Sequence, residues 1–533
     1  MANEDFQMDM ASDEIFHGVP LTDIPTLFQT PPVLSDMQDL DDRGHTFMIK
    51  PFKYDASNPN LDPEPIHGMG NYHDIWDDEH VRMPCSPLHL TNDRTPRWPI
   101  IQSALAELKQ KCDEKIATVN DIKIAIDKSN GTNFEIGSLQ QVLNQDYSDD
   151  QRAYFMSFTL PKMVSFALEV GNICSQPPPL LNIKTNRTVT MSQRQAASLL
   201  ACGFFCIFPH QFNRKIDNKY HSYQSFNFNH LFRRGSACQP EKLKCILHYF
   251  KRVSEDMPKG VFSFRRFSLP DEWIPKWKES QAPLCKIHIR TDRSIEEMHG
   301  LLQVDFANEY IGGGVMREGI TQEEIRFTVC PEMLISILVC EVMLSHECIL
   351  LIGCEQFTTY SGYADTFKFK DNFIDTTPKE SWGRKLCHVV AMDAIEFKDP
   401  ATQYTFENMR RELIKAYTCF RIPKSMEKCM FGVATGNWGC GAFNGDLQLK
   451  AIIQLMAASE VGRPLVYITW HDQTLLESFW IVYDYLANQQ ATVKDLCIYL
   501  QLYSMNHKQS GLFDYILNVP VSSLREAYKN DSA

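Results

Sequence analysis

The sequence predicts an α/β sandwich preceded by a mainly helical accessory domain. After about residue 280, short apolar runs alternate with amphipathic segments of helical length, which is typical of an α/β fold. Before that point, apolar residues recur mainly at the spacing of a helix. A chain of 533 residues also exceeds what one core usually holds, so two or three domains are expected.

Residues 1–95 are expected to form an acidic, largely irregular segment. They contain 18 acidic and 5 basic residues, which accounts for the whole net charge of −13, and prolines interrupt any periodicity. The apolar patch from Ile15 to Phe28 is the exception, and we expect it either to dock on the body or to bind a partner. The remaining chain is neutral, so direct sequence-specific binding of nucleic acid is not expected.

Residues 96–280 are expected to form the helical accessory domain. Ile101, Leu105, Leu108 and Cys112 are spaced so that they share one face of a helix. Further helical patterns lie at 154–168, with an interruption at Pro161, and at 196–208 and 242–253.

Residues 281–510 are expected to form the α/β domain, followed by a tail at 511–533. Strands are expected at 287–289, 303–306, 348–352, 388–392, 431–434 and 465–469, and helices at 331–344, 404–417, 446–459 and 473–487. No apolar run reaches the roughly 20 residues that a membrane helix needs. The 17 cysteines include no C-x-x-C pair, which favours a reducing, intracellular compartment, and no histidine spacing indicates a metal site.

The strand expected at 303–306 runs into the most informative motif of the chain. Asp305 and Asn308 stand near the end of this strand, and Gly312-Gly313-Gly314 follow. Glycines let a backbone approach a ligand closely. Because the triple glycine has apolar neighbours such as Val315, whereas linkers lie in polar sequence, a loop that holds a ligand is favoured over a flexible linker.

Gln322-Glu323-Glu324 comes shortly after the glycines. Adjacent glutamates usually belong to a solvated surface, but here Ile325 and Phe327 anchor the segment that follows. Neighbouring side chains point roughly 100° apart in a helix and to opposite faces of a strand. Two adjacent carboxylates are therefore expected to converge on one substrate only where the backbone is irregular.

A second glycine stretch, Gly436–Gly441, lies between an expected strand and an expected helix. This succession offers amides and a helix dipole to phosphate, so a diphosphate site is favoured over a turn that merely packs on the helix. No Lys-Ser/Thr follows, and the order G-x-x-G-x-G is a poor dinucleotide fingerprint. Tyr363 and Trp470 are suited either to stack on a ligand or to cover the core.

Taken together, these segments resemble the poly(ADP-ribose) glycohydrolase family. The family signature is a triple glycine followed by Gln-Glu-Glu, and Gly312–Gly314 and Gln322–Glu324 match it with a spacing of seven. The resemblance covers roughly residues 95–510 and is strongest from 285 to 475. It extends through Ile295-Glu296, Val304–Asn308, Thr359–Ala364, Met409–Tyr417 and Ala434–Phe443. Trp470 departs from it, because the family has a phenylalanine there.

The resemblance implies a macrodomain-like mixed-sheet domain that hydrolyses ribose–ribose O-glycosidic bonds of poly(ADP-ribose) and releases ADP-ribose. Glu324 would be the general acid/base, Glu323 its positioning partner, and Asp305 a support from the strand end. Because the two glutamates are adjacent, a covalent intermediate on a second carboxylate is not expected. No metal or other cofactor is implied. The implied partners are the polymer and poly(ADP-ribosyl)ated proteins, and a monomer in nucleus and cytoplasm, active in the DNA damage response, is also implied.

The resemblance further implies a set of residues that bind the substrate. Asn308 and Glu323 would hold ribose hydroxyls, and Gln322 belongs to the set as part of the signature. The diphosphate would lie on the amides of Gly312, Gly313, Gly314 and Val315 and on those of Asn437, Gly439, Cys440, Gly441, Ala442 and Phe443. Ile295 and Glu296 would read the adenine edge, Tyr363 would stack on adenine, and Phe443 or Trp470 would pack on the ribose.

Two other functions stay open on the sequence alone. A non-catalytic macrodomain that binds ADP-ribose would explain both glycine loops but not Glu323-Glu324. A nicotinamide-dependent oxidoreductase that uses the Gly436–Gly441 loop is disfavoured by the glycine order. Binding of polymer without release of ADP-ribose would indicate the first, and binding of NADH without affinity for ADP-ribose would indicate the second.

Overall fold

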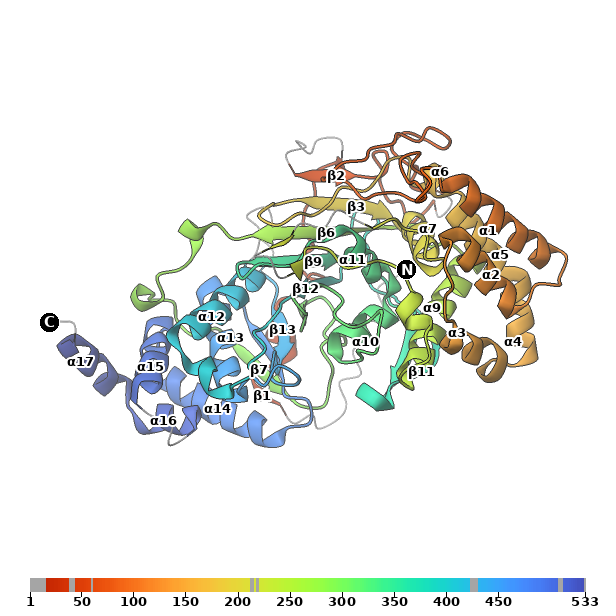
Figure 1. Cartoon of the computed structure of the whole chain (residues 1–533). Helices are drawn as coiled ribbons and strands as arrows, with labels where there is room; N and C mark the ends of the chain where they lie inside the picture. Colours follow the sequence, from red (N-terminus) through yellow and green to blue (C-terminus); the bar gives the residue numbers. More distant parts are fainter. Residues whose placement is uncertain are drawn as a thin grey trace. The chain divides into compact units, whose positions relative to one another are not determined.

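The computed structural model describes residues 16–37, 44–58, 61–210, 215–216, 220–421, 430–506 and 511–531 (Figure 1). Contacts divide the chain into two units. The first unit contains Met1–Thr26, Pro275–Gln303 and Ile395–Ala533, and the second contains Leu27–Ile274 and Val304–Ala394. Each unit therefore combines segments that are far apart in the sequence. The domain boundaries expected from the sequence stay a prediction.

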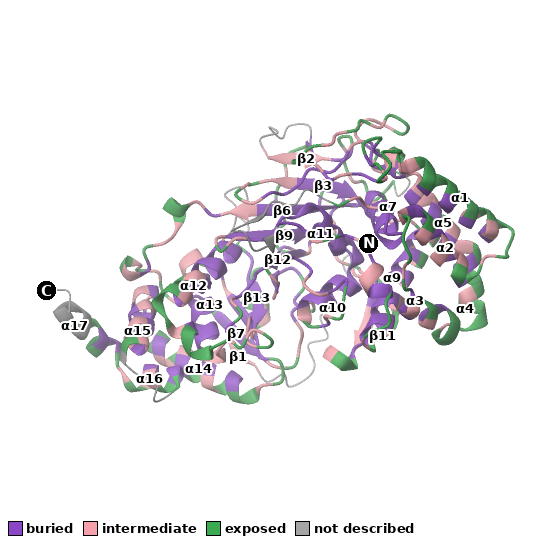
Figure 2. Ribbon diagram, in the orientation of Figure 1, coloured by how far each residue is buried: buried purple, intermediate pink, exposed green. Residues whose placement is uncertain are grey.

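The second unit is built around a mixed sheet. Its strands lie in the order β12 (His388–Ala391), β9 (Glu347–Ile352), β6 (Val261–Ser268), β3 (Thr188–Ser192) and β2 (His45–Phe47). Neighbouring strands are antiparallel, except β3 and β2, which are parallel. One row of paired residues crosses four of these strands and is buried throughout: Val389, Leu351, Phe264 and Val189. Figure 2 shows β9 and its neighbours mainly in the colour of buried residues. The β-branched valines and the aromatic Phe264 suit a pleated, buried surface. The small hairpin of β10 (Thr358–Ser361) and β11 (Lys368–Asn372) belongs to the same unit.

The helices of the second unit include most of the predicted accessory domain. They are α1 (Trp98–Asp113), α2 (Val119–Asn130), α3 (Gly137–Gln141), α4 (Asp149–Tyr154), α5 (Leu160–Leu168), α6 (Val170–Ile173), α7 (Gln193–Phe204), α8 (Asn229–Phe232), α9 (Cys238–Glu255), α10 (Gln322–Val329) and α11 (Ile335–Val339). The face predicted for the first helix is confirmed, because Ile101, Leu105, Leu108 and Cys112 are all buried on α1. The interruption expected at Pro161 takes the form of a π-helical turn, Phe155–Thr159, before α5. Pro161 lies in the first turn of α5, where its missing N–H costs nothing.

The single long helix expected at 331–344 is wrong. A 3₁₀ turn, Pro331–Leu334, leads into the short helix α11, and the chain is extended from Cys340 onward. The Leu181 amide donates to the Val339 carbonyl at 2.7 Å, and the Glu341 amide donates to the Leu181 carbonyl at 3.3 Å. These bonds to a distant segment satisfy the backbone groups that would otherwise continue the helix.

The first unit contains mostly parallel strands. Their order is β1 (His17–Gly18), β7 (Ile287–Arg290), β14 (Leu465–Ile468) and β13 (Val433–Gly436), and β13 also pairs with the first two residues of β8 (Leu302–Asp305). All pairs are parallel except β1 with β7. Its helices are α12 (Phe406–Phe420), α13 (Leu447–Val461), α14 (Gln473–Asn488), α15 (Val493–Asn506), α16 (Leu512–Asn518) and α17 (Val521–Asp531).

Strand β13 begins two residues later than expected. The carbonyl of Phe431 accepts a hydrogen bond from the buried Arg463 side chain at 2.8 Å, and the amide of Gly432 donates to the Pro25 carbonyl at 2.9 Å. The Phe431 carbonyl and the Gly432 amide are therefore bonded to groups outside the pairing of β13 with β14, which starts at Val433.

The apolar patch near the N-terminus docks within the first unit, as one of the two alternatives predicted. The Phe16 ring stacks on His288 with centroids 4.8 Å apart, and β1 pairs with β7. Ile24 is 1% exposed and lies against Gly432. Ile15 lies outside the described residues.

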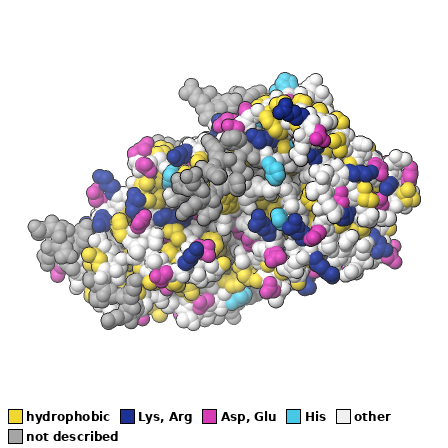
Figure 3. Space-filling model, viewed as in Figure 1, with side chains coloured by type: hydrophobic (Ala, Val, Ile, Leu, Met, Phe, Trp, Pro, Cys, Tyr) yellow, Lys and Arg dark blue, Asp and Glu magenta, His cyan; other side chains and the backbone are white. Residues whose placement is uncertain are grey.

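Acidic and basic side chains are interspersed over the face of the molecule in Figure 3. Within the described part of the chain, no helix has the length and apolar character needed to cross a bilayer.

Candidate active site

The loop between β8 and α10 holds the central residues of the predicted site, all within the second unit from Val304 onward. Gln322 fixes the two ends of this loop to each other. Its side-chain oxygen accepts from the Phe306 amide at 2.8 Å, and its side-chain nitrogen donates to the Val304 carbonyl at 3.2 Å. The end of β8 and the start of α10 are thereby held side by side.

Glu323 and Glu324 occupy the first turn of α10, and the glycine loop lies over both carboxylates. Glu323 accepts the amide N–H groups of Asn308 at 2.9 Å and Gly312 at 2.6 Å. Glu324 accepts the Gly314 amide at 2.8 Å on one oxygen, and both the amide and the hydroxyl of Thr321 at 2.7 Å on the other. The bond from the Thr321 amide belongs to a helix capping box, in which the Thr321 side chain in turn accepts the backbone amide of Glu324.

This geometry shows where the irregular backbone expected at the glutamate pair lies. The pair itself is helical, and the irregular backbone belongs to the glycine loop that contacts it. Both residues are nearly fully buried, with 2% exposure for Glu323 and 7% for Glu324.

The close approach of the loop to the two carboxyl groups, and not only the binding of a ligand, explains why glycine stands at 312 and 313. Gly312 and Gly313 have φ of +86° and +49°. A Cβ atom on Gly313 would lie 2.6 Å from an oxygen of Glu323 and 2.6 Å from an oxygen of Glu324, which no real Cβ tolerates. Only glycine can therefore bring the loop this close to the pair.

The four amides predicted to hold a diphosphate all donate within this loop. Those of Gly312 and Gly314 bind the two glutamates, as described, whereas those of Gly313 and Val315 donate to the carbonyls of Tyr310 and Gly312 at 3.0 Å each. Phosphate binding by these amides therefore requires them to exchange their present partners for the ligand.

Asp305 adds a third carboxyl group at the end of β8. It is fully buried, and neither of its carboxyl oxygens has a hydrogen-bond partner among the described residues. Burial, followed by the charge of Glu324, raises the pKa of Asp305 well above its usual range, while Arg326 opposes this shift. Burial and then the charges of Asp305 and Glu324 likewise raise the pKa of Glu323, against the two amide hydrogen bonds. Asp305 and Glu323 thus keep their protons to a higher pH than ordinary carboxyl groups do.

Asn308 and Tyr363 also lie at this loop. The Asn308 side chain accepts the Tyr310 amide at 3.0 Å. Tyr363 stands between β10 and β11 and is 38% exposed; its phenol interacts with the backbone amide of Gln322, and burial raises its pKa. The structure therefore brings Tyr363 to the N-terminus of α10.

The other predicted residues lie in the first unit. Ile295 is buried and Glu296 half-buried in the segment between β7 and β8, where the Glu296 carbonyl accepts from the Gln303 side chain at 3.2 Å. Trp470 follows β14 with a φ of +55° and is 47% exposed. This exposure excludes the alternative in which Trp470 only covers the core.

The second glycine loop has the predicted order of strand, turn and helix, running from β13 to α13. The Asn437 side chain accepts from the Tyr467 hydroxyl at 3.2 Å and donates to the Thr469 carbonyl at 3.1 Å. Gly439 has a φ of +73°, and the Cys440 amide donates to the Asn437 carbonyl at 3.1 Å. The outer part of the loop is more open: Gly441 and Ala442 are exposed, and Phe443 is half-buried.

Two charged residues at the first glycine loop escaped the sequence analysis. Lys242 on α9 is fully buried, and Arg326 on α10 is 6% exposed. The sequence does contain an indication for Lys242. Its spacing from Cys238, Cys245 and Ile246 places it on the apolar face of a helix, where a lysine is unusual. Within the described residues, no group of three or more His, Cys, Asp or Glu side chains is arranged to hold a metal ion.

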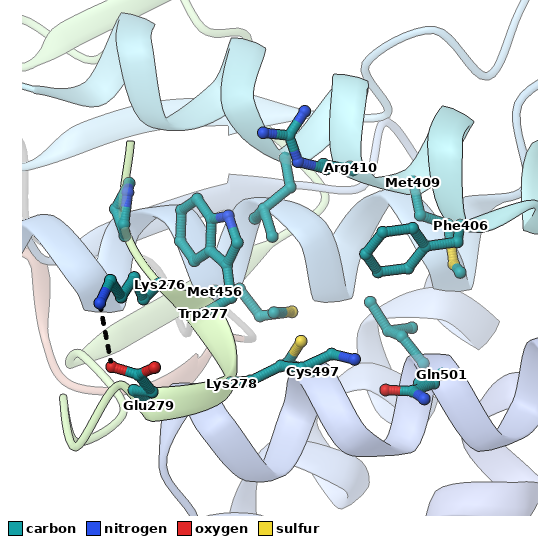
Figure 4. Close-up of a pocket in the computed structure, with 13 residues that line it drawn as sticks. Lys276, Trp277, Lys278, Glu279, Phe406, Met409, Arg410, Met456, Cys497 and Gln501 are labelled. Atoms are coloured by element: carbon teal, nitrogen blue, oxygen red, sulfur yellow. Dashed lines mark ion pairs between the residues drawn. The ribbon is translucent and has the colours of Figure 1, made fainter. Parts of the chain in front are cut away.

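A separate pocket of about 290 Å³ lies in the first unit (Figure 4). Its wall is mainly apolar, with Trp277, Phe406, Met409 and Met456, and an ion pair of 3.7 Å joins Lys276 to Glu279 at its edge. It contains none of the residues predicted to bind substrate.

Comparison with known proteins agrees with this arrangement. Residues 274–477 match the model of the poly(ADP-ribose) glycohydrolase macrodomain fold, and residues 147–266 match that of the helical domain of the same family. A probable poly(ADP-ribose) glycohydrolase 2 of Arabidopsis thaliana is 34% identical over 368 residues, which is 59% of this chain and 69% of that protein. Poly(ADP-ribose) glycohydrolase 1 of the same plant is 31% identical over 412 residues, covering 63% and 74%. Poly(ADP-ribose) glycohydrolase 1 of Caenorhabditis elegans is 32% identical over 334 residues, covering 60% and 41%.

These matches confirm the predicted fold class, a helical domain before a macrodomain-like α/β domain. They cover the segment that holds the glutamate pair and the helices from α4 to α9. The chain belongs to the poly(ADP-ribose) glycohydrolase family, whose members are glycosidases.

Proposed function

We propose that the chain hydrolyses the ribose–ribose O-glycosidic bonds of poly(ADP-ribose) and releases ADP-ribose, with Glu324 as the general acid/base. One observation carries this proposal. Glu323 and Glu324 are buried side by side at the start of a helix, beneath a glycine loop and near the buried Asp305. A protein that only bound ADP-ribose would not need three carboxyl groups buried close together, because the burial of polar groups is costly.

The proposed reaction follows the general chemistry of glycosidases. The Glu324 carboxylic acid donates its proton to the leaving 2′-oxygen as the bond to the anomeric carbon breaks. A water molecule then adds to the anomeric carbon and returns a proton to the Glu324 carboxylate. Glu323 and the diphosphate of the substrate stabilise the positive charge that develops at the ribose. No covalent intermediate is proposed. Both glutamates extend from the same turn of α10, so they are not placed on opposite sides of the glycosidic bond.

The substrate contacts belong to the same proposal. In the second unit, Asn308 and Glu323 would hold ribose hydroxyls, and Tyr363 would stack on adenine. For the first unit, the roles that the resemblance implies stay predictions: adenine contacts for Ile295 and Glu296, phosphate contacts for the loop at 437–443, and ribose contacts for Phe443 or Trp470. The exposed Trp470 and the open outer part of the loop are consistent with these roles.

The decisive variant is Glu324→Gln. The amide side chain keeps the shape of the carboxylate but cannot exchange a proton, so release of ADP-ribose from polymer is expected to fall at least about 100-fold. Affinity for ADP-ribose, measured by calorimetry, is expected to change little. Glu114→Gln is the control, because Glu114 is an exposed glutamate at the end of α1 and outside the loop. If Glu324→Gln kept near-normal turnover, the mechanism would be wrong; if the wild type bound polymer without releasing ADP-ribose, the chain would be a non-catalytic binder.

We also propose a monomer present in nucleus and cytoplasm and active in the DNA damage response, as the family resemblance implies. Light scattering of the purified chain tests the first point. Fractionation of cells before and after DNA damage tests the second.

A further inference from the structure

Lys242 lies inside the second unit with no exposed surface, and its ammonium group is enclosed by one turn of the glycine loop. Its Nζ donates to the carbonyl oxygens of Val315 at 3.0 Å, Arg317 at 2.9 Å and Gly319. An ammonium group has three N–H donors and no acceptor, so these three carbonyls satisfy it completely.

The same loop contacts the glutamate pair through its other polar groups. Its carbonyls at 315, 317 and 319 face Lys242, whereas its amides at 312, 314 and 321 face Glu323 and Glu324. A cation on α9 thus holds the carbonyls of the loop, and two carboxyl groups on α10 hold its amides. The charge of Glu324 also favours the protonated state of Lys242 and raises its pKa, against the effect of burial.

We propose that Lys242 is a positioning residue for the proposed glycosidase reaction. By holding three carbonyls of the loop, it keeps the amides of Gly314 and Thr321 on the Glu324 carboxylate. This inference rests on the proposed function and assigns a task to a residue outside the macrodomain match at 274–477.

The surroundings of Lys242 make its charge costly. Its helical neighbours Cys238, Cys245 and Ile246 are buried, so the ammonium group has lost its water, and its hydrogen bonds to the three loop carbonyls offset this cost. The three N–H donors of the Lys242 ammonium group order the same loop that contacts Glu324, the proposed acid/base. Such placement within a fraction of an ångström is what catalysis needs from residues that do not touch the substrate.

The test uses the full chain with Lys242→Met, which keeps the length of the side chain but removes its charge and its donors. Lys244→Met is the matched control, because Lys244 stands two positions along the same helix and forms ion pairs with Asp146 at 2.9 Å and Glu241 at 2.8 Å. In Lys242→Met, kcat on poly(ADP-ribose) is expected to fall about 10- to 100-fold, with KM and ADP-ribose affinity within about threefold. Hydrogen exchange of the amides at 312–321 is expected to accelerate.

Several results would overturn the proposal. They are a kcat of Lys242→Met within about threefold of the wild type, an equal loss in Lys244→Met, or unchanged exchange of the loop amides. If the wild type cleaved no polymer, the proposed function would fail, while the exchange measurement would still decide whether Lys242 holds the loop.

The pH profile of kcat provides a second test. Burial lowers the pKa of Lys242 to about 8, while the titratable groups that face it, Glu324, Cys238 and Glu318, act in the opposite direction. A neutral amine has only two N–H donors for three carbonyls, so kcat is expected to decline as the pH rises through 8. The decline should be absent from Lys242→Met. A wild-type kcat that stays constant through this range would contradict the proposal.

Discussion

Three buried carboxyl groups, those of Asp305, Glu323 and Glu324, lie near the start of α10. Their hydrogen-bond partners differ from one residue to the next. Glu323 and Glu324 each accept backbone amides, whereas Asp305 is buried without a hydrogen-bond partner in the described structure. A carboxyl group without compensation keeps its proton, because burial penalises the charged form. Asp305 is therefore suited to limit the total negative charge beside Glu324 rather than to contact the substrate.

This arrangement predicts a stability that falls with rising pH. The pKa values of Asp305 and Glu323 are raised in the folded chain, so above the ordinary carboxyl pKa of about 4 the folded state binds protons that the unfolded state has released. The free energy of unfolding contributed by these groups is fully present below that pKa. It is lost as the pH rises toward the raised values.

Urea unfolding at several pH values above 4 measures this slope. Asp305→Asn removes one of the two titrations, so the slope is expected to become shallower. Asp365→Asn, at a site between β10 and β11, serves as the control. An unchanged slope in Asp305→Asn would show that Asp305 titrates normally.

At the scale of elements, the arrangement of the site depends on the glycine loop and α10 together. The loop supplies amides to the carboxylates, and α10 supplies the carboxylates in its first turn. Acidic residues are favoured there by the unsatisfied amides and the helix dipole. The burial of two adjacent glutamates is thus explained by helix-terminus chemistry as well as by function.

Gly313→Ala is expected to separate the two elements. The added Cβ would overlap an oxygen of each glutamate at 2.6 Å and would also strain a φ of +49°. We expect kcat to fall about 100-fold and the free energy of unfolding by about 2 kcal/mol. Activity assays and urea unfolding measure the two effects.

Gly131→Ala is the matched control for backbone strain. Gly131 has a φ of +66° after α2, and a Cβ there meets nothing within 4 Å. It should lose about 1 kcal/mol of stability and keep its activity. Equal loss of activity in both variants would contradict the role given to Gly313.

At the scale of the whole molecule, the predicted domains are interleaved by strand pairing. β6 lies before residue 280 and β9 after residue 281, yet Ser263 to Ser268 pair with Ile352 to Glu347 in the sheet of the second unit. β9 pairs on its other side with β12. A cut near residue 280 therefore leaves β9 with an open edge in the middle of a sheet.

A fragment of residues 281–533 is accordingly expected not to fold by itself. Its unpaired β9 edge, flanked by buried apolar residues, is expected to cause aggregation. Expression, sedimentation and thermal unfolding check this, with residues 16–533 as the control. A soluble fragment with one cooperative transition would contradict the expected dependence on β6.

The sequence predicted the local features well, and its failures have physical causes. The strands at 287–289, 348–352 and 465–469 agree with β7, β9 and β14 within a residue at each end, because buried strands read as continuous apolar runs. The single helix expected at 331–344 does not form, because the backbone of Leu181, far away in the sequence, bonds the Val339 carbonyl and the Glu341 amide. Lys242 was missed because a lysine in a helix normally indicates solvent.

The sequence by itself determined the family, the fold class and the pair Glu323-Glu324, since these depend on local composition and on the spacing of a motif. The tertiary structure alone decided the surroundings of the pair. It placed the glutamates in a helix beneath the irregular glycine loop, bonded the amides of Gly312 and Gly314 to their carboxyl groups, and enclosed Lys242 in the loop carbonyls. These are contacts between segments distant in sequence, and their energies depend on burial, which no local pattern records.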